Sequence, residues 1–93
     1  MRIDLALKHL CLVKSRSIVK HLCEDGAVTI NDRPARPAAV VRAGDHLAIR
    51  FPHRKLIIEL VDVPGKQLSK STAPTYYRIV SDEKTRDDDD YFD

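Results

Sequence analysis

Apolar residues recur at helical spacing close to the start of the chain. Ile3, Ala6, Leu7 and Leu10 follow the i, i+3, i+4, i+7 pattern that places side chains on one face of an α-helix. Asp4 falls in the first turn of this helix, where the positive end of the helix dipole favours a carboxylate. The pattern therefore predicts a first helix that buries a single apolar stripe.

A second apolar stripe follows a break in the period at residues 12–13. Ser15 or Ser17 can cap the start of this second helix, and Gly26 suits the left-handed position just beyond its end. The stripe consists of Ile18, Val19, Leu22 and Cys23. Two helices of two to three turns each are stable only when their stripes pack on another element.

That other element is predicted to be a β-sheet, because apolar residues alternate with polar ones after residue 26. Asn31 and Asp32 are turn residues, and Pro34 and Pro37 exclude a central strand over residues 33–38. Gly44 and Asp45 form the turn before a strand in which Leu47, Ile49 and Phe51 face inward. The expected strands are 27–30, 46–51, 56–63 and a short one at the sheet edge, 76–80.

These elements predict an α+β fold in which two N-terminal helices pack on a small antiparallel sheet of about four strands. We expect one domain over residues 1–63, followed by a loop and short extension over residues 64–80 that packs on the sheet. From residue 81 onward there are seven acidic residues against two basic ones. This composition predicts a disordered acidic tail over residues 81–93.

The charge is distributed unevenly along the chain. The 93 residues carry a formal net charge of +2. Residues 1–55 contain 11 Lys and Arg against 5 Asp and Glu, whereas residues 56–93 contain 5 against 9. A basic body followed by an acidic end is typical of a protein that binds polyanions, but also of an ordinary mixed surface. Charge alone leaves both interpretations open.

The sequence offers no pattern of catalytic or metal-binding residues. Cys11 and Cys23 are the only cysteines, and without metal-ligand spacing we expect them to be free, buried thiols in a reducing cytosol. His21 and Cys23 would point about 200° apart on a helix, so we expect no zinc site and no cofactor. We also expect no signal peptide and no membrane span, and hence a cytoplasmic protein.

The order of several residues resembles a known family. The matching pattern is Arg2-x-Asp4, Ser15-Arg16, Gly26-x-Val28-x-Ile30-Asn31 and Val41-x-x-Gly44-Asp45-x-Leu47-x-Ile49. It resembles the S-four RNA-binding domain, also called the α-L motif, over residues 2–51. The remainder, up to Tyr77-x-Ile79-Val80, is similar to the stand-alone members of this family that act in ribosome quality control, with the fifteen-kilodalton heat-shock proteins as relatives.

The resemblance implies a function that composition and spacing do not show. It implies binding to a large ribosomal subunit obstructed by peptidyl-tRNA after stalling, with contacts to ribosomal RNA and tRNA. It also implies support for addition of a C-terminal tail to the stalled chain, with a tail-adding quality control protein as a further partner. We therefore expect a non-enzymatic, monomeric RNA-binding factor.

Six basic residues are the candidate RNA contacts. The first four come from the helices and the last two from the turn after the first strand: Arg2, Lys14, Arg16, Lys20, Arg33 and Arg36. Arg16 and Lys20 are four residues apart and share a helix face. The alternative is that these side chains are simply solvated. Asp4 is expected to cap the helix or to pair with Arg2 or Arg16. Asn31 is expected to be an ordinary turn residue.

Other functions remain to be distinguished from this one. The chain could be a general rRNA- or tRNA-binding module, or an accessory subunit of an RNA-modifying enzyme. Residues 44–52 also faintly resemble a ubiquitin-like sulfur carrier. Such a carrier needs a C-terminal Gly-Gly, and the sequence ends Asp90-Tyr91-Phe92-Asp93. We therefore disfavour the sulfur carrier.

Overall fold

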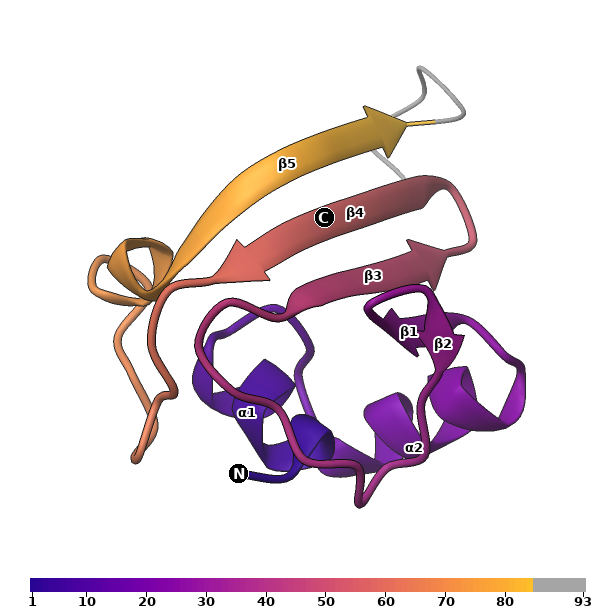
Figure 1. The fold of residues 1–93 in the computed structure, drawn as a ribbon, viewed down its shortest axis with the longest axis horizontal. Coiled ribbons are helices and arrows are strands. Elements are labelled where there is room, and N and C mark those ends of the chain that lie inside the picture. Colours follow the sequence, from indigo (N-terminus) through magenta and orange to yellow (C-terminus); the bar gives the residue numbers. More distant parts are fainter. Residues whose placement is uncertain (85–93) are drawn as a thin grey trace.

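The computed structural model describes residues 1–84 and shows the expected α+β architecture (Figure 1). Two helices precede a five-stranded antiparallel sheet, one strand more than the four or so that the sequence predicts. The helices are α1 (Ile3–His9) and α2 (Arg16–Glu24). The strands are β1 (Val28–Ile30), β2 (Arg33–Pro34), β3 (His46–Phe51), β4 (Arg54–Leu60) and β5 (Tyr77–Lys84), with a 3-10 turn, η1 (Ala73–Tyr76), before β5.

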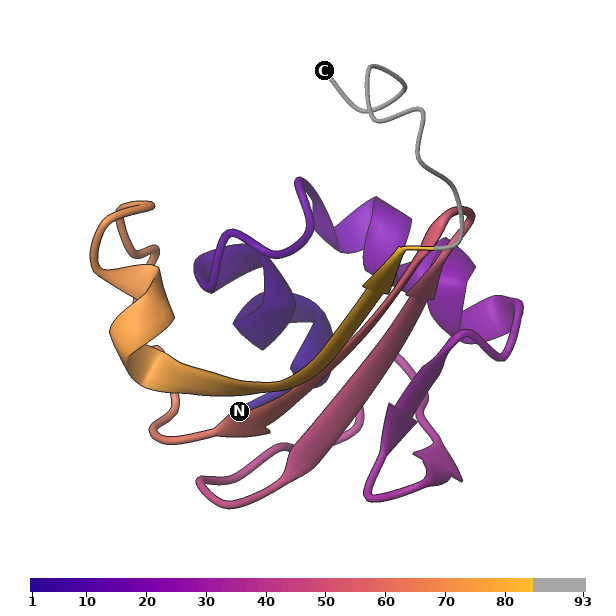
Figure 2. The same ribbon diagram turned by 90° about the horizontal axis from the view of Figure 1, so that it is seen from above.

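The sheet has the order β2-β1-β3-β4-β5, and every neighbouring pair is antiparallel. Both helices lie on one face of this curved sheet (Figures 1 and 2). In the central pair, Leu47 is opposite Ile58 and Ile49 is opposite Leu56, and all four side chains are buried. The alternation in the sequence thus places one side of each central strand under the helices.

The predicted helix stripes form the other half of the core, with one correction. The four residues of the first stripe, three in α1 and the C-cap residue Leu10, are at most 1% exposed. In α2, Val19 is fully buried and Leu22 and Cys23 are partly buried against the core, but Ile18 is 41% exposed. The buried face of α2 is therefore narrower than predicted, and Ile18 lies outside it.

The helix ends follow their local sequence signals. Ser15 is the N-cap of α2, where its Oγ accepts a hydrogen bond from the Ile18 N–H at 3.3 Å. Gly26 adopts the predicted left-handed conformation, with φ +71°. Cys11 also has a positive φ of 61° and is exposed rather than buried as predicted, because it forms the turn that ends α1.

Strand β2 was not predicted, and it results from a tight hairpin turn. Asn31 and Asp32 both have positive φ values, 51° and 69°, so the chain reverses at once and Arg33 pairs with Ile30. β2 lies at the edge of the sheet, where Pro34 is tolerated because its missing N–H interrupts no central ladder.

The C-terminal strand is longer than predicted. β4 ends at Leu60 rather than at residue 63, and residues 61–72 form a loop that leads through η1 into β5. β5 runs to Lys84, so residues 81–84 belong to the sheet and the predicted tail begins too early. The ladder with β4 continues to this end of β5, and across it Arg54 donates to both carboxylate oxygens of Asp82 at 2.8 and 2.9 Å. The rest of the predicted tail, residues 85–93, lies outside the described residues.

Candidate nucleic-acid interface

A buried carboxylate lies at the centre of the candidate site. The Asp4 side chain, in the first turn of α1, is only 6% exposed. Its Oδ1 accepts a hydrogen bond from the Leu5 N–H at 2.7 Å, which helps to fix the orientation of the carboxylate. A buried carboxylate is stable when charged donors compensate its lost hydration.

Two arginines supply that compensation: the sequence left open whether Asp4 caps the helix or pairs with Arg2 or Arg16, and Asp4 pairs with both. Arg2 donates from Nε to Oδ1 at 3.2 Å and from Nη2 to Oδ2 at 3.1 Å, a bidentate arrangement. Arg16, at the start of α2, donates from Nε and Nη2 to Oδ2 at 3.4 and 3.2 Å. The two arginine side chains remain 50% and 48% exposed. Each guanidinium has donors beyond those used by Asp4, so it can bind a second anion while it stays anchored.

The connection between β2 and β3 brings Arg36 to the same region. This connection is hydrogen-bonded to the start of the chain, with the Ile3 N–H donating to the Ala39 carbonyl at 2.7 Å and the Asp4 N–H to Pro37 at 3.2 Å. Arg2 also forms an isolated antiparallel bridge with Val40. The beginning of α1 is thereby fixed beside the segment that carries Arg36.

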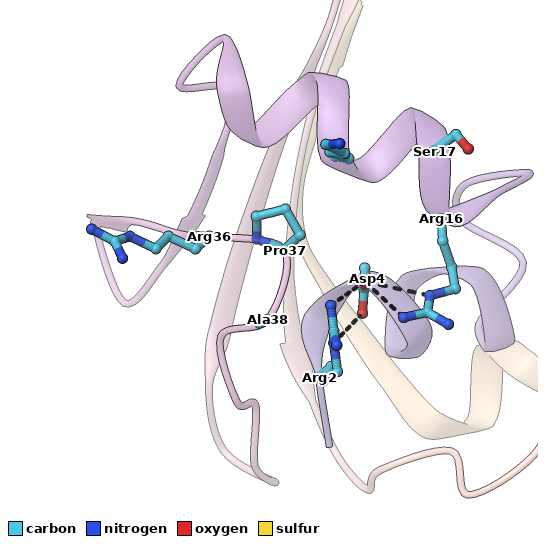
Figure 3. A pocket seen from close by; sticks show the side chains of 8 residues that line it. Arg2, Asp4, Arg16, Ser17, Arg36, Pro37 and Ala38 are labelled. Carbon is cyan, nitrogen blue, oxygen red and sulfur yellow. Dashed lines mark hydrogen bonds and ion pairs between the residues drawn. The ribbon is translucent and has the colours of Figure 1, made fainter.

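These elements border an open depression of about 660 Å³, which we call the arginine depression. Its lining consists of Arg2, Asp4, Arg16, Ser17, Lys20, Arg36, Pro37 and Ala38. Four cationic side chains therefore line the depression together with one carboxylate that is already paired with two of them. Figure 3 shows the Asp4 carboxylate between the Arg2 and Arg16 guanidinium groups, while the Arg36 side chain points away from them.

The structure thus brings together four of the six predicted contact residues: Arg2, Arg16, Lys20 and Arg36. Lys14 lies instead in a second depression, and Arg33 in a third one beside Arg42 and Asp45. Whether any of the six contacts RNA stays a prediction. Sequence spacing could not show which of the six residues share a depression. That depends on how the connection between β2 and β3 folds back on α1.

Asn31 has a structural role at the edge of the sheet. Its Nδ2 donates to Asp45 Oδ1 at 3.1 Å, and its Oδ1 accepts from the His46 N–H at 2.9 Å. Asp45 in turn accepts from the Arg42 N–H at 2.8 Å, which closes the turn before β3. The Asn31 amide is therefore engaged in joining the β1–β2 turn to the start of β3.

The second depression contains two basic residues that were not among the six candidate RNA contacts. Lys8 and Lys70 line it together with Lys14, although they are far apart in the sequence. Lys8 follows Leu7 in α1 and Lys70 lies in a segment without periodicity, and neither was among the candidate contacts. No local signal joins them, because the extension must first fold against α1.

Within residues 1–84, no group of three or more His, Cys, Asp or Glu side chains is arranged to hold a metal ion. No helix in this part of the chain is long and apolar enough to cross a membrane. Both cysteines are free thiols. Burial, together with the negative charges of Asp4 and Glu24, raises the pKa of Cys23 above its ordinary value.

Comparisons with known proteins find relatives along most of the chain. The S4 domain family, the S-four family named above, matches residues 1–47. The RQC P-site tRNA stabilizing factor of Halalkalibacterium halodurans is 36% identical over 83 residues, which cover 89% of this chain and 93% of the relative. The protein of the same name from Bacillus subtilis is 33% identical, covering 90% of this chain and 96% of the relative.

A solved structure confirms the fold. Heat Shock Protein 15 of Vibrio cholerae, described as trimeric, superposes with a TM-score of 0.81 and 25% sequence identity. The match covers 87% of this chain and 82% of that protein. The likeness therefore extends beyond residues 1–47, into the strands that follow.

Proposed function

The chain belongs to the S4 domain family and to the family of the RQC P-site tRNA stabilizing factors, and on this premise we propose that it binds ribosomal RNA and tRNA. The observation that carries the proposal is the anchored pair of Arg2 and Arg16. Their guanidinium groups are fixed by one buried carboxylate, and the two side chains are still half exposed. Fixed guanidiniums bind phosphate oxygens with little further loss of side-chain freedom.

The geometry favours recognition of the RNA backbone over recognition of bases. The deep groove of an A-form helix is too narrow for side chains to read base edges. An open depression surrounded by cations can instead contact phosphates and 2′-hydroxyls along one strand. Arg2 and Arg16 would hold the strand in register, while Lys20 and Arg36 would supply further charge at the border.

The proposed target is the large ribosomal subunit that retains peptidyl-tRNA after translation has stalled. The relatives' name supports it, because it describes stabilisation of P-site tRNA. In this proposal the chain is a cytoplasmic, monomeric factor that acts by binding, without catalysis. It holds the tRNA while a tail-adding quality control protein extends the stalled chain.

A sucrose gradient of stressed cells tests this target. Tagged wild-type protein should migrate with free large subunits that carry peptidyl-tRNA, whereas Arg2→Gln/Arg16→Gln should remain at the top. Lys66→Gln, which changes an exposed lysine outside the arginine depression, is the matched control and should migrate like the wild type.

The outcome also separates the alternatives. Migration of the wild type with small subunits, or only at the top of the gradient, would count against the proposal. Binding to bulk tRNA without association with large subunits would favour a general RNA-binding module. Loss of folding in the double variant, monitored by circular dichroism, would show that Arg2 and Arg16 act through structure.

A further inference from the structure

A second basic depression is formed where the extension after β4 packs against the end of α1. It has a volume of about 330 Å³, and we call it the lysine depression. Its lining consists of Lys8, Cys11, Val13, Lys14, Gln67 and Lys70. The three lysines come from α1, from the α1–α2 connection and from the extension, so only the folded chain brings them together.

Several contacts hold the extension in place. The Leu68 N–H donates to the His9 carbonyl at 3.1 Å, and His9 Nδ1 lies 2.9 Å from the Pro64 carbonyl oxygen. Gln67 Nε2 donates to the Lys8 carbonyl at 3.2 Å. The Leu68 side chain is buried in the core at 8% exposure. The segment that carries Lys70 is thus attached to the end of α1 and does not hang free in solvent.

No acidic side chain lines the lysine depression, so its positive charge is not neutralised by the residues that form it. Three ammonium groups face no Asp or Glu among the six lining residues. The lining residues lie within residues 8–14 and 67–70, and neither of these segments contains an acidic residue. Clustered cations raise the local concentration of anions, and they are stabilised when an anion binds between them.

The lysine depression is also adjacent to the arginine depression along the chain. Lys14 lines the former and Arg16 the latter, and only Ser15 separates them. Two residues span at most about 7 Å between Cα atoms. One RNA strand that contacts Arg16 can therefore continue past Lys14 toward Lys8 and Lys70.

We propose that the lysine depression is a second phosphate-binding site, which extends the path of the RNA backbone beyond the arginine depression. This inference rests on the proposed function, since it adds contacts to the same ligand. Lysines act as mobile point charges, so the site adds affinity without reading sequence. Lys70 and Gln67 lie outside residues 1–47, so the S4 domain match does not contain this site.

The salt dependence of binding to tRNA tests the site. The probe is end-labelled bulk tRNA, and fluorescence anisotropy gives the dissociation constant of the full chain between about 50 and 200 mM KCl. Lys8→Gln/Lys70→Gln should weaken binding and lower the slope of log K against log salt by about 1.5 to 2, as expected for two lost phosphate contacts. Lys8→Arg/Lys70→Arg should keep the wild-type slope.

Lys66→Gln is the matched control, because Lys66 belongs to the same extension but does not line the depression. Its slope should change little. A double Gln variant with the wild-type slope would overturn the second site, as would an equal change for Lys66→Gln. No binding of the wild type to tRNA would overturn it too. If Arg16→Gln alone loses binding to large subunits, the proposed function stands whatever the lysine variants show.

Discussion

Arg16 donates two hydrogen bonds, from Nε at 3.4 Å and from Nη2 at 3.2 Å, to the Oδ2 atom of Asp4. This contact joins the first turn of α1 to the first turn of α2. It therefore fixes the direction of a guanidinium that would otherwise move freely on a solvent-exposed helix end. We therefore expect Asp4 to organise the proposed RNA-binding surface, although its carboxylate repels phosphate.

Replacing Asp4 shows whether RNA affinity depends on the orientation of Arg2 and Arg16 or only on the net charge of the surface. Asp4→Asn removes one negative charge, which by itself should strengthen RNA binding. We expect weaker binding, because Arg2 and Arg16 lose their common carboxylate. The loss of these half-exposed pairs should also lower the free energy of unfolding by about 1–2 kcal/mol.

Fluorescence anisotropy with tRNA at one fixed salt concentration, and urea unfolding of the same samples, measure both effects of Asp4→Asn. Tighter binding by this variant would show that charge alone governs affinity.

The geometry of Arg16 should matter beyond its charge. Arg16→Lys keeps the positive charge but cannot donate from Nε and Nη2 together, so the side chain is less well oriented. We expect RNA affinity to fall roughly threefold to tenfold, or roughly 0.6–1.4 kcal/mol. RNA affinity should fall further in Arg16→Gln. Equal affinities for the wild type and the Lys variant in anisotropy titrations would contradict the role of the fork-shaped donor.

The ion pair between β4 and β5 predicts a dependence of stability on pH. The hydrogen bond from Arg54 lowers the pKa of Asp82 below its ordinary value of 3.8. A carboxylate with a lowered folded pKa stabilises the fold above its unfolded pKa, and this contribution is lost as pH falls through the folded value. Because the pair is partly exposed, its contribution should be about 0.5 kcal/mol.

Urea unfolding of the wild type and Asp82→Asn over a pH series checks this ion pair. The wild type should be the more stable protein near neutral pH, and the difference should disappear once the pH falls well below 3.8. A difference that persists in acid would assign the effect to packing instead of charge.

At Gly26, in the turn after α2, there is space for a side chain, but the backbone conformation is unfavourable for any residue other than glycine. Gly26 has φ +71°, and an added Cβ would meet nothing within 4 Å. Gly26→Ala should therefore destabilise the fold by about 1 kcal/mol through backbone strain alone, with RNA affinity unchanged. Thermal unfolding followed by circular dichroism measures the first effect, and a stability equal to that of the wild type would contradict the predicted strain.

The helices and the inner strands could be predicted from the sequence because their signals are local. The apolar stripe of α1, the Ser15 cap and the bounds of β3 each follow from neighbouring residues. β5 could not be placed as well. Its acidic residues are typical of a solvated tail, and their place in the sheet depends on pairing with β4, where Arg54 binds Asp82 and Lys55 lies opposite Glu83.

The candidate site shows the same division between local and long-range signals. Pairing of Asp4 with Arg2 or Arg16 was one of two expected roles, and the structure shows pairing with both. The separation of Lys14 and Arg33 from the arginine depression, and the joining of Lys8 to Lys70, required the folded connections. Two-residue strands such as β2 and contacts across some 60 residues leave no periodic trace in a sequence.

Photo-crosslinking from the arginine depression tests the central claim most directly. A benzophenone amino acid would replace Ser17, which lines this depression, or Val80, which is 48% exposed on β5. Each protein would be irradiated on large subunits that carry peptidyl-tRNA. We predict that position 17 crosslinks to ribosomal RNA or tRNA far more than position 80 does. Crosslinks to RNA only from position 80, or from neither position while the protein stays bound, would contradict the assignment of the arginine depression as the RNA-binding surface.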